Sequence, residues 1–195
     1  MGTSQEGAEM KEIVRLSVVL AVVGCLAGVA LSSVYSLTRQ QILLQEQKAI
    51  FTAQKALFPE AEEFKPLEIE AQVLGSVWID RAYEAMNAEN QAIGLLVNAR
   101  TPGYGGMIVF VVGFDLDKQV RGVQVTSQSE TPGLGANVTK SSFLDQFVNK
   151  SIQDPFVVKN DVKPITASTI TTKALVQGLK SSIEWLQSND RGGTS

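Results

Sequence analysis

An uncharged apolar run near the N-terminus constrains this chain more than any other feature. Residues 16–38 read LSVVLAVVGCLAGVALSSVYSLT and are bounded by Arg15 and Arg39. At about 1.5 Å per residue, a helix of this length spans roughly 34 Å, enough to cross a hydrocarbon core of about 30 Å. Its Leu and Val residues favour insertion by about 0.3 to 0.6 kcal/mol each, which outweighs the scattered serines. The run predicts a transmembrane helix.

A cleaved signal peptide is the alternative for this run, because Ala30-Leu31-Ser32 could serve as a cleavage site. The length of the run and the glutamates in its basic N-terminal flank favour a retained helix. Gly24 and Gly28 form a G-x-x-x-G spacing that would let a partner helix approach, although small residues are common in any membrane helix. Lys and Arg residues flank both ends, so charge leaves the orientation open.

Composition excludes several classes of chemistry. The 195 residues include no histidine and one cysteine, Cys25, within the apolar run. Catalysis by a Ser-His-Asp or Cys-His pair, an internal disulfide and a zinc or iron–sulfur site made by this chain alone are therefore excluded, and we expect no metal ligands and no catalytic residues. The formal net charge of −3 gives no basic footprint for nucleic acid. Redox chemistry would need a bound cofactor.

The chain beyond the apolar run has the pattern of one soluble α+β domain. Apolar residues at helical spacing up to Leu57, followed by Pro59, predict that the membrane helix continues as a stalk. Residues rich in β-branched side chains predict strands at 73–79, 92–98, 107–114 and 119–126, the last two forming a hairpin. Helices are expected at 141–150, capped by a hydroxyl, and at 169–186.

These patterns predict four parts. We expect an N-terminal flank and transmembrane helix over residues 1–38, a helical stalk over 39–60, a domain over 61–190 and a disordered tail over 191–195. The domain should contain a mainly antiparallel sheet with flanking helices.

Three segments of the domain have the composition of a ligand site. Gly103-Tyr104-Gly105-Gly106 would let backbone approach a flat ligand, and residues 130–135, ETPGLG, form a rigid turn with free N–H groups. Residues 165–172, ITASTITT, place five hydroxyls at a predicted helix start, where backbone N–H groups without intrahelical partners favour a phosphate. Glycine-rich turns and simple helix capping are the alternatives.

The order of a membrane helix, GYGG, ETPGLG and a threonine-rich helix start resembles the covalent-FMN subunits of the Rnf and sodium-pumping NADH:quinone oxidoreductase complexes. In that family the motif [ST]-G-A-T-x-[ST] carries FMN through a phosphoester on its threonine. Residues 166–171, TASTIT, occupy the motif here, with Ala167 at the usual glycine and Ser168 at the usual alanine. Lys163 stands where an acidic residue is frequent, with Asp161 nearby. The length and the N-terminal run are more similar to the G subunit of Rnf.

The resemblance implies a function and a set of site residues. FMN would be esterified to Thr169 by a separate flavin transferase, because an unassisted threonine is a weak nucleophile. The other expected cofactor-binding residues are Tyr104, Thr131, Gly133, Leu134, Gly135, Thr166, Ser168 and Thr171. The chain would relay electrons as a subunit of an ion-translocating ferredoxin:NAD oxidoreductase, with no independent turnover.

The resemblance also implies a location and partners. The protein would be a single-pass protein of the bacterial inner membrane with its domain on the extracytoplasmic side, and its partners would be the other membrane, iron–sulfur and flavin subunits. Three alternatives remain open: the equivalent quinone-reductase subunit, a stand-alone flavin reductase and a non-redox membrane-tethered interaction module.

Overall fold

The computed structural model describes residues 3–189, so the expected disordered tail at 191–195 lies outside the described residues. The chain separates into two compact units, one up to Gln45 and one from Glu46 onward. One long helix, α1 (Thr3–Leu57), contributes residues to both. The domain boundaries expected at residues 38 and 60 stay predictions.

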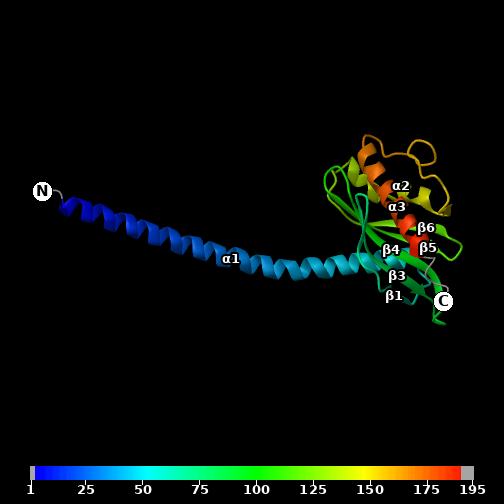
Figure 1. Ribbon diagram of the computed structural model, residues 1–195, viewed down its shortest axis with the longest axis horizontal. Helices are drawn as coiled ribbons and strands as arrows, with labels where there is room; N and C mark the ends of the chain where they lie inside the picture. The colour runs from blue at the N-terminus through cyan, green and yellow to red at the C-terminus, as the bar shows by residue number, and fades with distance from the viewer. Residues whose placement is uncertain (1–2, 190–195) are drawn as a thin grey trace. The chain divides into compact units, whose positions relative to one another are not determined.

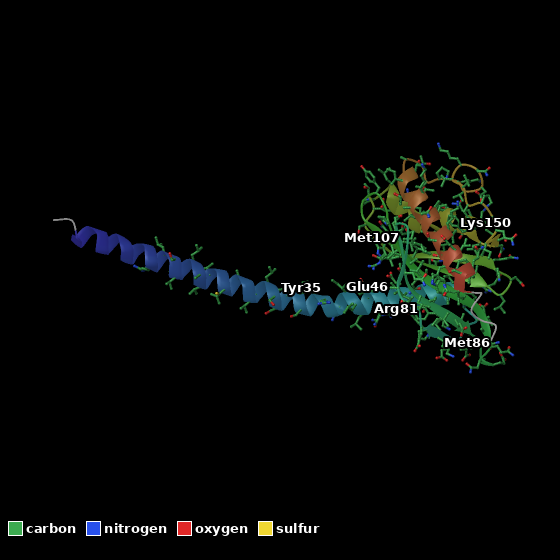
Figure 2. The ribbon with its side chains drawn as sticks, viewed as in Figure 1. Tyr35, Glu46, Arg81, Met86, Met107 and Lys150 are labelled. Atoms are coloured by element: carbon green, nitrogen blue, oxygen red, sulfur yellow. The ribbon has the colours of Figure 1, made fainter. Side chains whose placement is uncertain are left out.

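In the first unit, the apolar side chains that the structure describes, from Leu16 onward, are exposed. Leu20 is 74% and Leu31 73% exposed, and the side chain of Tyr35 also points outward (Figure 2). From Arg15 to Leu57 the helix is long and apolar enough, by length and composition, to cross a membrane. Such a surface is unfavourable in water, and a lipid environment would cover it.

The second unit is built on an antiparallel sheet, as the strand patterns predict. Its strands are β1 (Glu63–Leu67), β2 (Gln72–Leu74), β3 (Val77–Met86), β4 (Ala92–Pro102), β5 (Met107–Asp115), β6 (Gln119–Gln128) and β7 (Lys150–Ser151). They lie in the order β1-β3-β4-β5-β6-β7, and β2 pairs with β3. The expected hairpin of β5 and β6 is confirmed, with Val112 opposite Val123.

Two features of the sheet differ from the sequence prediction. The strand expected at 73–79 is divided, because Gly75 adopts a φ of +63° and turns the chain so that Val73 pairs with Trp78. Strand β1 was not predicted, since its charged sequence EFKPL lacks an apolar alternation. Pro66 is tolerated there because β1 is an edge strand.

Helices cover both faces of the sheet. The C-terminal helix α3 (Thr169–Asn189), red in Figure 1, packs Leu175, Leu179 and Trp185 into the larger core, with sheet residues such as Phe110. The last turn of α1 packs on the opposite face, where Leu57 and its neighbours meet side chains of β3, β4 and β5. The predicted helix at 169–186 is therefore confirmed, and the sheet is the middle layer of the domain.

The helix expected at 141–150 is shorter than predicted. It consists of α2 (Ser141–Leu144) followed by a 3₁₀ turn, η2 (Asp145–Phe147). Val148 then adopts an extended backbone, because the chain turns back to pair Lys150 with Val120 of β6. The expected hydroxyl cap was wrong as well, since Lys140 is the N-cap residue and makes no side-chain capping bond.

Candidate functional site

The three segments singled out in the sequence meet at one cavity of about 420 Å³. The turn before β5, the loop at 130–135 and the start of α3 surround it. Its lining residues are Tyr104, Glu130, Thr131, Leu134, Gly135, Ala167, Ser168, Thr169, Ile170 and Thr171. The volume lies within the range of about 300 to 1,000 Å³ that is typical of small-molecule and cofactor sites.

The buried carboxylate of Glu130 connects these segments. The residue is only 6% exposed. Its Oε1 accepts hydrogen bonds from the backbone N–H of Tyr104 (2.7 Å) and Gly105 (3.1 Å). Its Oε2 accepts a hydrogen bond from the hydroxyl of Thr171 on α3 (2.7 Å). One side chain therefore ties the turn before β5 to the helix start.

Most hydroxyls of the threonine-rich segment are committed to internal bonds. Ser168 Oγ donates to Thr171 Oγ1 (2.7 Å), and Thr172 Oγ1 donates to the carbonyl of Ser168 (2.9 Å) while accepting from the N–H of Ile165 (3.0 Å). The Ser168 hydroxyl therefore donates to a side chain of α3. The cluster stabilises the loop that enters α3.

Thr169 differs from these neighbours. It is exposed, it lines the cavity and it is the first residue of α3. Within residues 3–189 its hydroxyl takes part in no side-chain hydrogen bond. The first N–H groups of a helix have no intrahelical partner and carry partial positive charge. A free hydroxyl thus lies beside donors suited to a phosphate.

Ala167, which precedes this helix start, adopts a left-handed backbone conformation with a φ of +58°. Glycine adopts such a φ without steric cost, whereas alanine does so at a cost of roughly 1–2 kcal/mol. The geometry gives a physical reason for the glycine that the motif normally has at this position.

The structure brings most of the predicted site residues together. Those that line the cavity are Tyr104, Thr131, Leu134, Gly135, Ser168, Thr169 and Thr171. Thr166 lies instead on a neighbouring cavity of about 460 Å³, together with Lys163 and Gln146. Gly133 belongs to the same loop as Thr131 but is absent from the cavity lining, and its φ of +78° makes it a turn residue.

Sequence reasoning missed the role of Glu130. Its segment was singled out for its turn, but the carboxylate was not, because a single acidic residue beside Thr-Pro-Gly is ordinary in a solvated loop. Its hydrogen-bond partners lie 25, 26 and 41 residues away along the chain. No local pattern could have shown that this side chain is buried.

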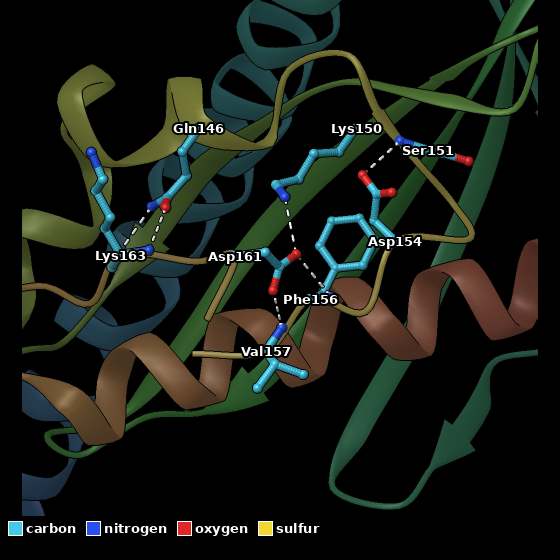
Figure 3. A network of polar contacts seen from close by, with 8 residues as sticks. All are labelled: Gln146, Lys150, Ser151, Asp154, Phe156, Val157, Asp161 and Lys163. Carbon is cyan, nitrogen blue, oxygen red and sulfur yellow. Dashed lines mark hydrogen bonds and ion pairs between the residues drawn. The ribbon is translucent and has the colours of Figure 1, made fainter. Parts of the chain in front are cut away.

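A polar network holds the segment that leads into the threonine loop (Figure 3). Asp161 accepts hydrogen bonds from Lys150 Nζ (3.0 Å) and from the N–H groups of Phe156 and Val157. Burial by itself raises the pKa of the Asp161 carboxyl. The hydrogen bond from Val157 and the positive charge of Lys150 together lower the pKa by more than burial raises it, so the pKa lies below its ordinary value. Asp161 is therefore occupied with internal contacts.

Lys163 is fixed through its backbone rather than its side chain. Its N–H donates to Gln146 Oε1 (2.8 Å), and its carbonyl accepts from Gln146 Nε2 (3.3 Å), as Figure 3 shows. Among the described residues no group of three or more Cys, Asp or Glu side chains is arranged to hold a metal ion. The cavity at the start of α3 is lined by hydroxyls, the Glu130 carboxylate, glycine backbone and apolar side chains.

A family model described as an FMN-binding domain matches residues 103–184, a range that contains every residue lining this cavity. The G subunit of the ion-translocating oxidoreductase complex of Methanosarcina acetivorans is 30% identical over 192 residues, covering 94% of this chain and 99% of that protein. The chain belongs to the family of these G subunits.

Two further relatives of the same family extend the match. The G subunit of the proton-translocating ferredoxin:NAD(+) oxidoreductase complex of Clostridium ljungdahlii is 30% identical, covering 82% of this chain and 83% of that protein. The G subunit of the Na(+)-translocating ferredoxin:NAD(+) oxidoreductase complex of Acetobacterium woodii is 26% identical, covering 92% and 94%. The family therefore includes members named for different ions.

Among solved structures, the crystal structure of Shewanella oneidensis NqrC matches with a TM-score of 0.47 and 18% identity. The match covers 65% of this chain and 67% of that chain. A likeness of this degree assigns no function.

Proposed function

We propose that this protein is the electron-relay subunit of an ion-translocating ferredoxin:NAD oxidoreductase complex and carries FMN esterified to Thr169. The observation that carries the proposal is the exposed hydroxyl of Thr169, which lines the cavity and makes no side-chain hydrogen bond within residues 3–189. It lies at the start of α3, where the first N–H groups of a helix have no intrahelical partner. The names of the related G subunits and the FMN-binding family model support the same assignment.

The cavity suits both ends of such a cofactor. The start of α3 would hold the phosphate through backbone N–H groups and the positive end of the helix dipole. Tyr104 and Leu134, which also line the cavity and are 73% and 43% exposed, would contact the ring. Bound FMN accepts and passes on electrons, and the chain's own residues hold and orient it.

Attachment would be a phosphoryl transfer without oxidation or reduction. Thr169 Oγ1 forms a bond to the phosphorus of an activated flavin phosphate, the bond from that phosphorus to its leaving group breaks, and the threonine proton passes to the leaving group. No basic side chain hydrogen-bonds the Thr169 hydroxyl in the described part of the chain, so this hydroxyl has no activating partner of its own. We therefore infer that a separate flavin transferase loads the protein.

The apolar part of α1 would anchor the protein in the bacterial inner membrane as a single-pass helix, with the domain on the extracytoplasmic side. The exposed apolar side chains of this helix support the anchor. The partners would be the other membrane, iron–sulfur and flavin subunits of the complex.

The test is coexpression with a flavin transferase, followed by in-gel fluorescence of the denatured protein and mass spectrometry of the peptide that ends at Lys173. We expect FMN on Thr169 in the wild-type protein and in Thr169→Ser, and a folded but non-fluorescent Thr169→Ala variant. Thr52→Ala, an exposed threonine on α1, is the matched control and should load normally.

Other outcomes would support other assignments. A dark wild-type band under demonstrated transferase activity would favour a tethered interaction module. Covalent flavin retained by Thr169→Ala would refute the residue assignment. Turnover of a soluble donor by the isolated protein would favour a stand-alone reductase, and copurified quinone-reductase subunits would favour that complex.

A further inference from the structure

The hydroxyls beside Thr169 have a fixed hydrogen-bonding direction. The Glu130 carboxylate can only accept hydrogen bonds, so the Thr171 hydroxyl donates its single proton to Oε2. Thr171 Oγ1 in turn accepts the hydrogen bond that the Ser168 hydroxyl donates with its own single proton. Neither hydroxyl has a proton left to donate to a ligand in the cavity that both of them line.

Close packing keeps the carboxylate in this position. A Cβ atom at Gly103 would overlap Glu130 Oε1, and one at Gly135 would overlap Oε2. The two backbone donors on Oε1 fix the other side of the group. The carboxylate therefore lies close against both glycine segments and is hydrogen-bonded at each of its oxygens.

From this geometry we propose that Glu130 is a positioning residue for the flavin site. Acting through Thr171 and Ser168, it holds the loop before α3 and turns both hydroxyls into acceptors. Thr169 keeps its hydroxyl free for esterification, and the flavin phosphate depends on backbone N–H groups rather than on the neighbouring hydroxyls. This inference rests on the proposed FMN attachment at Thr169.

The charge of Glu130 has a second consequence, because the residue itself lines the cavity. Reduction adds negative charge to a flavin, and a nearby carboxylate opposes that addition. Glu130 therefore lowers the midpoint potential of the bound flavin. A residue that acted only on the fold would leave this potential unchanged.

Two substitutions separate the hydrogen bond from the charge. Glu130→Gln removes the charge and places an amide N–H₂ toward Thr171, which reverses the hydroxyl chain and releases the Ser168 proton. Thr171→Val removes the hydroxyl link at nearly constant volume and keeps the charge. Thr171→Ser restores the hydroxyl, and Glu184→Gln removes a charge from an exposed position of α3 as the matched control.

The experiment uses the full chain in detergent, a flavin transferase and its flavin donor, with thermal unfolding recorded for every variant. We expect Glu130→Gln and Thr171→Val to acquire FMN about tenfold more slowly or worse, since a lost charge-assisted hydrogen bond affects loop placement on that scale. Glu184→Gln should load at the wild-type rate, and Thr171→Ser should load faster than Thr171→Val because it restores the hydroxyl. After complete loading, Glu130→Gln alone should show a more positive midpoint potential.

The outcomes distinguish this inference from the proposed function. A wild-type protein that acquires no FMN refutes the function itself. If the wild-type protein loads, wild-type loading rates in both Glu130→Gln and Thr171→Val overturn the positioning role. An unchanged potential in Glu130→Gln overturns the effect of the charge. If Glu130→Gln does not fold, the difference in FMN loading rate between Thr171→Val and Thr171→Ser still tests the positioning role.

Discussion

Ala167 shows how one residue of the binding loop is held in an unfavourable backbone conformation. Because its φ is +58°, Ala167→Gly removes a cost of roughly 1–2 kcal/mol, part of which is offset by the greater freedom of glycine in the unfolded chain. We expect a net gain of up to about 1 kcal/mol in the free energy of unfolding, measured by denaturant titration. Ala167→Val should lose stability, since β-branched residues avoid this region.

The control for Ala167 is Ala88→Gly in an exposed turn, because Ala88 is not among the residues with positive φ. It should show no gain in stability. Equal effects of glycine at both positions would contradict the strain at Ala167.

Asp161 makes stability depend on pH. Its pKa is lower in the folded protein than the ordinary value of 3.8, so its stabilising contribution is complete above that value and is lost as the pH falls through the folded pKa. Asp161→Asn should cost about 1–3 kcal/mol at neutral pH, because the N–H donors and Lys150 lose a charged acceptor. The variant should also lose less stability than wild type on acidification below about pH 4.

Urea unfolding at several pH values between neutral and acid would measure this difference for Asp161→Asn. Asp117→Asn, in the exposed turn between β5 and β6, is the control and should follow the wild-type curve. Parallel curves for Asp161→Asn and wild type would show that Asp161 does not contribute to acid sensitivity.

At the scale of elements, α3 lies close to the sheet because of one glycine. A Cβ atom at Gly178 would overlap the ring of Phe110, which is fully buried in β5. Gly178→Ala gains about 1 kcal/mol of helix propensity but overpacks the core by typically 1–3 kcal/mol. We expect a net loss of up to about 2 kcal/mol in the free energy of unfolding, measured by chemical denaturation.

Lys180→Ala, at an exposed position of the same helix, should change stability by no more than about 0.5 kcal/mol. A stabilised Gly178→Ala variant would mean that α3 can move away from β5 at little cost. Because α3 also begins at Thr169, such a variant would be expected to alter the binding cavity as well.

At the scale of the whole molecule, the two units are stabilised by different surroundings. The apolar side chains described between Leu16 and Leu44 are exposed and suited to lipid, whereas the domain from Glu46 onward buries its own core. The last turn of α1 belongs to that core, since Leu57 and Phe58 are buried against the sheet. The helix therefore joins a membrane environment to a folded domain without an intervening loop.

The sequence by itself determined the features that depend on neighbouring residues. The apolar run at 16–38, the hairpin of β5 and β6 and the helix from Thr169 could be predicted because composition and periodicity act locally. The three segments that line the cavity at the start of α3 could be named for the same reason. Their glycines and hydroxyls are visible in the sequence.

Only the tertiary structure decided how those segments act together. Glu130 became the centre of the site because its hydrogen-bond partners come from a turn and a helix that are distant in sequence. The same contacts distinguish Thr169 from Ser168 and Thr171. The three residues look alike in the sequence, but the hydroxyls of Ser168 and Thr171 are hydrogen-bonded within the loop and that of Thr169 is not. Burial and hydrogen-bond direction are properties of the packed domain, so no local pattern could reveal them.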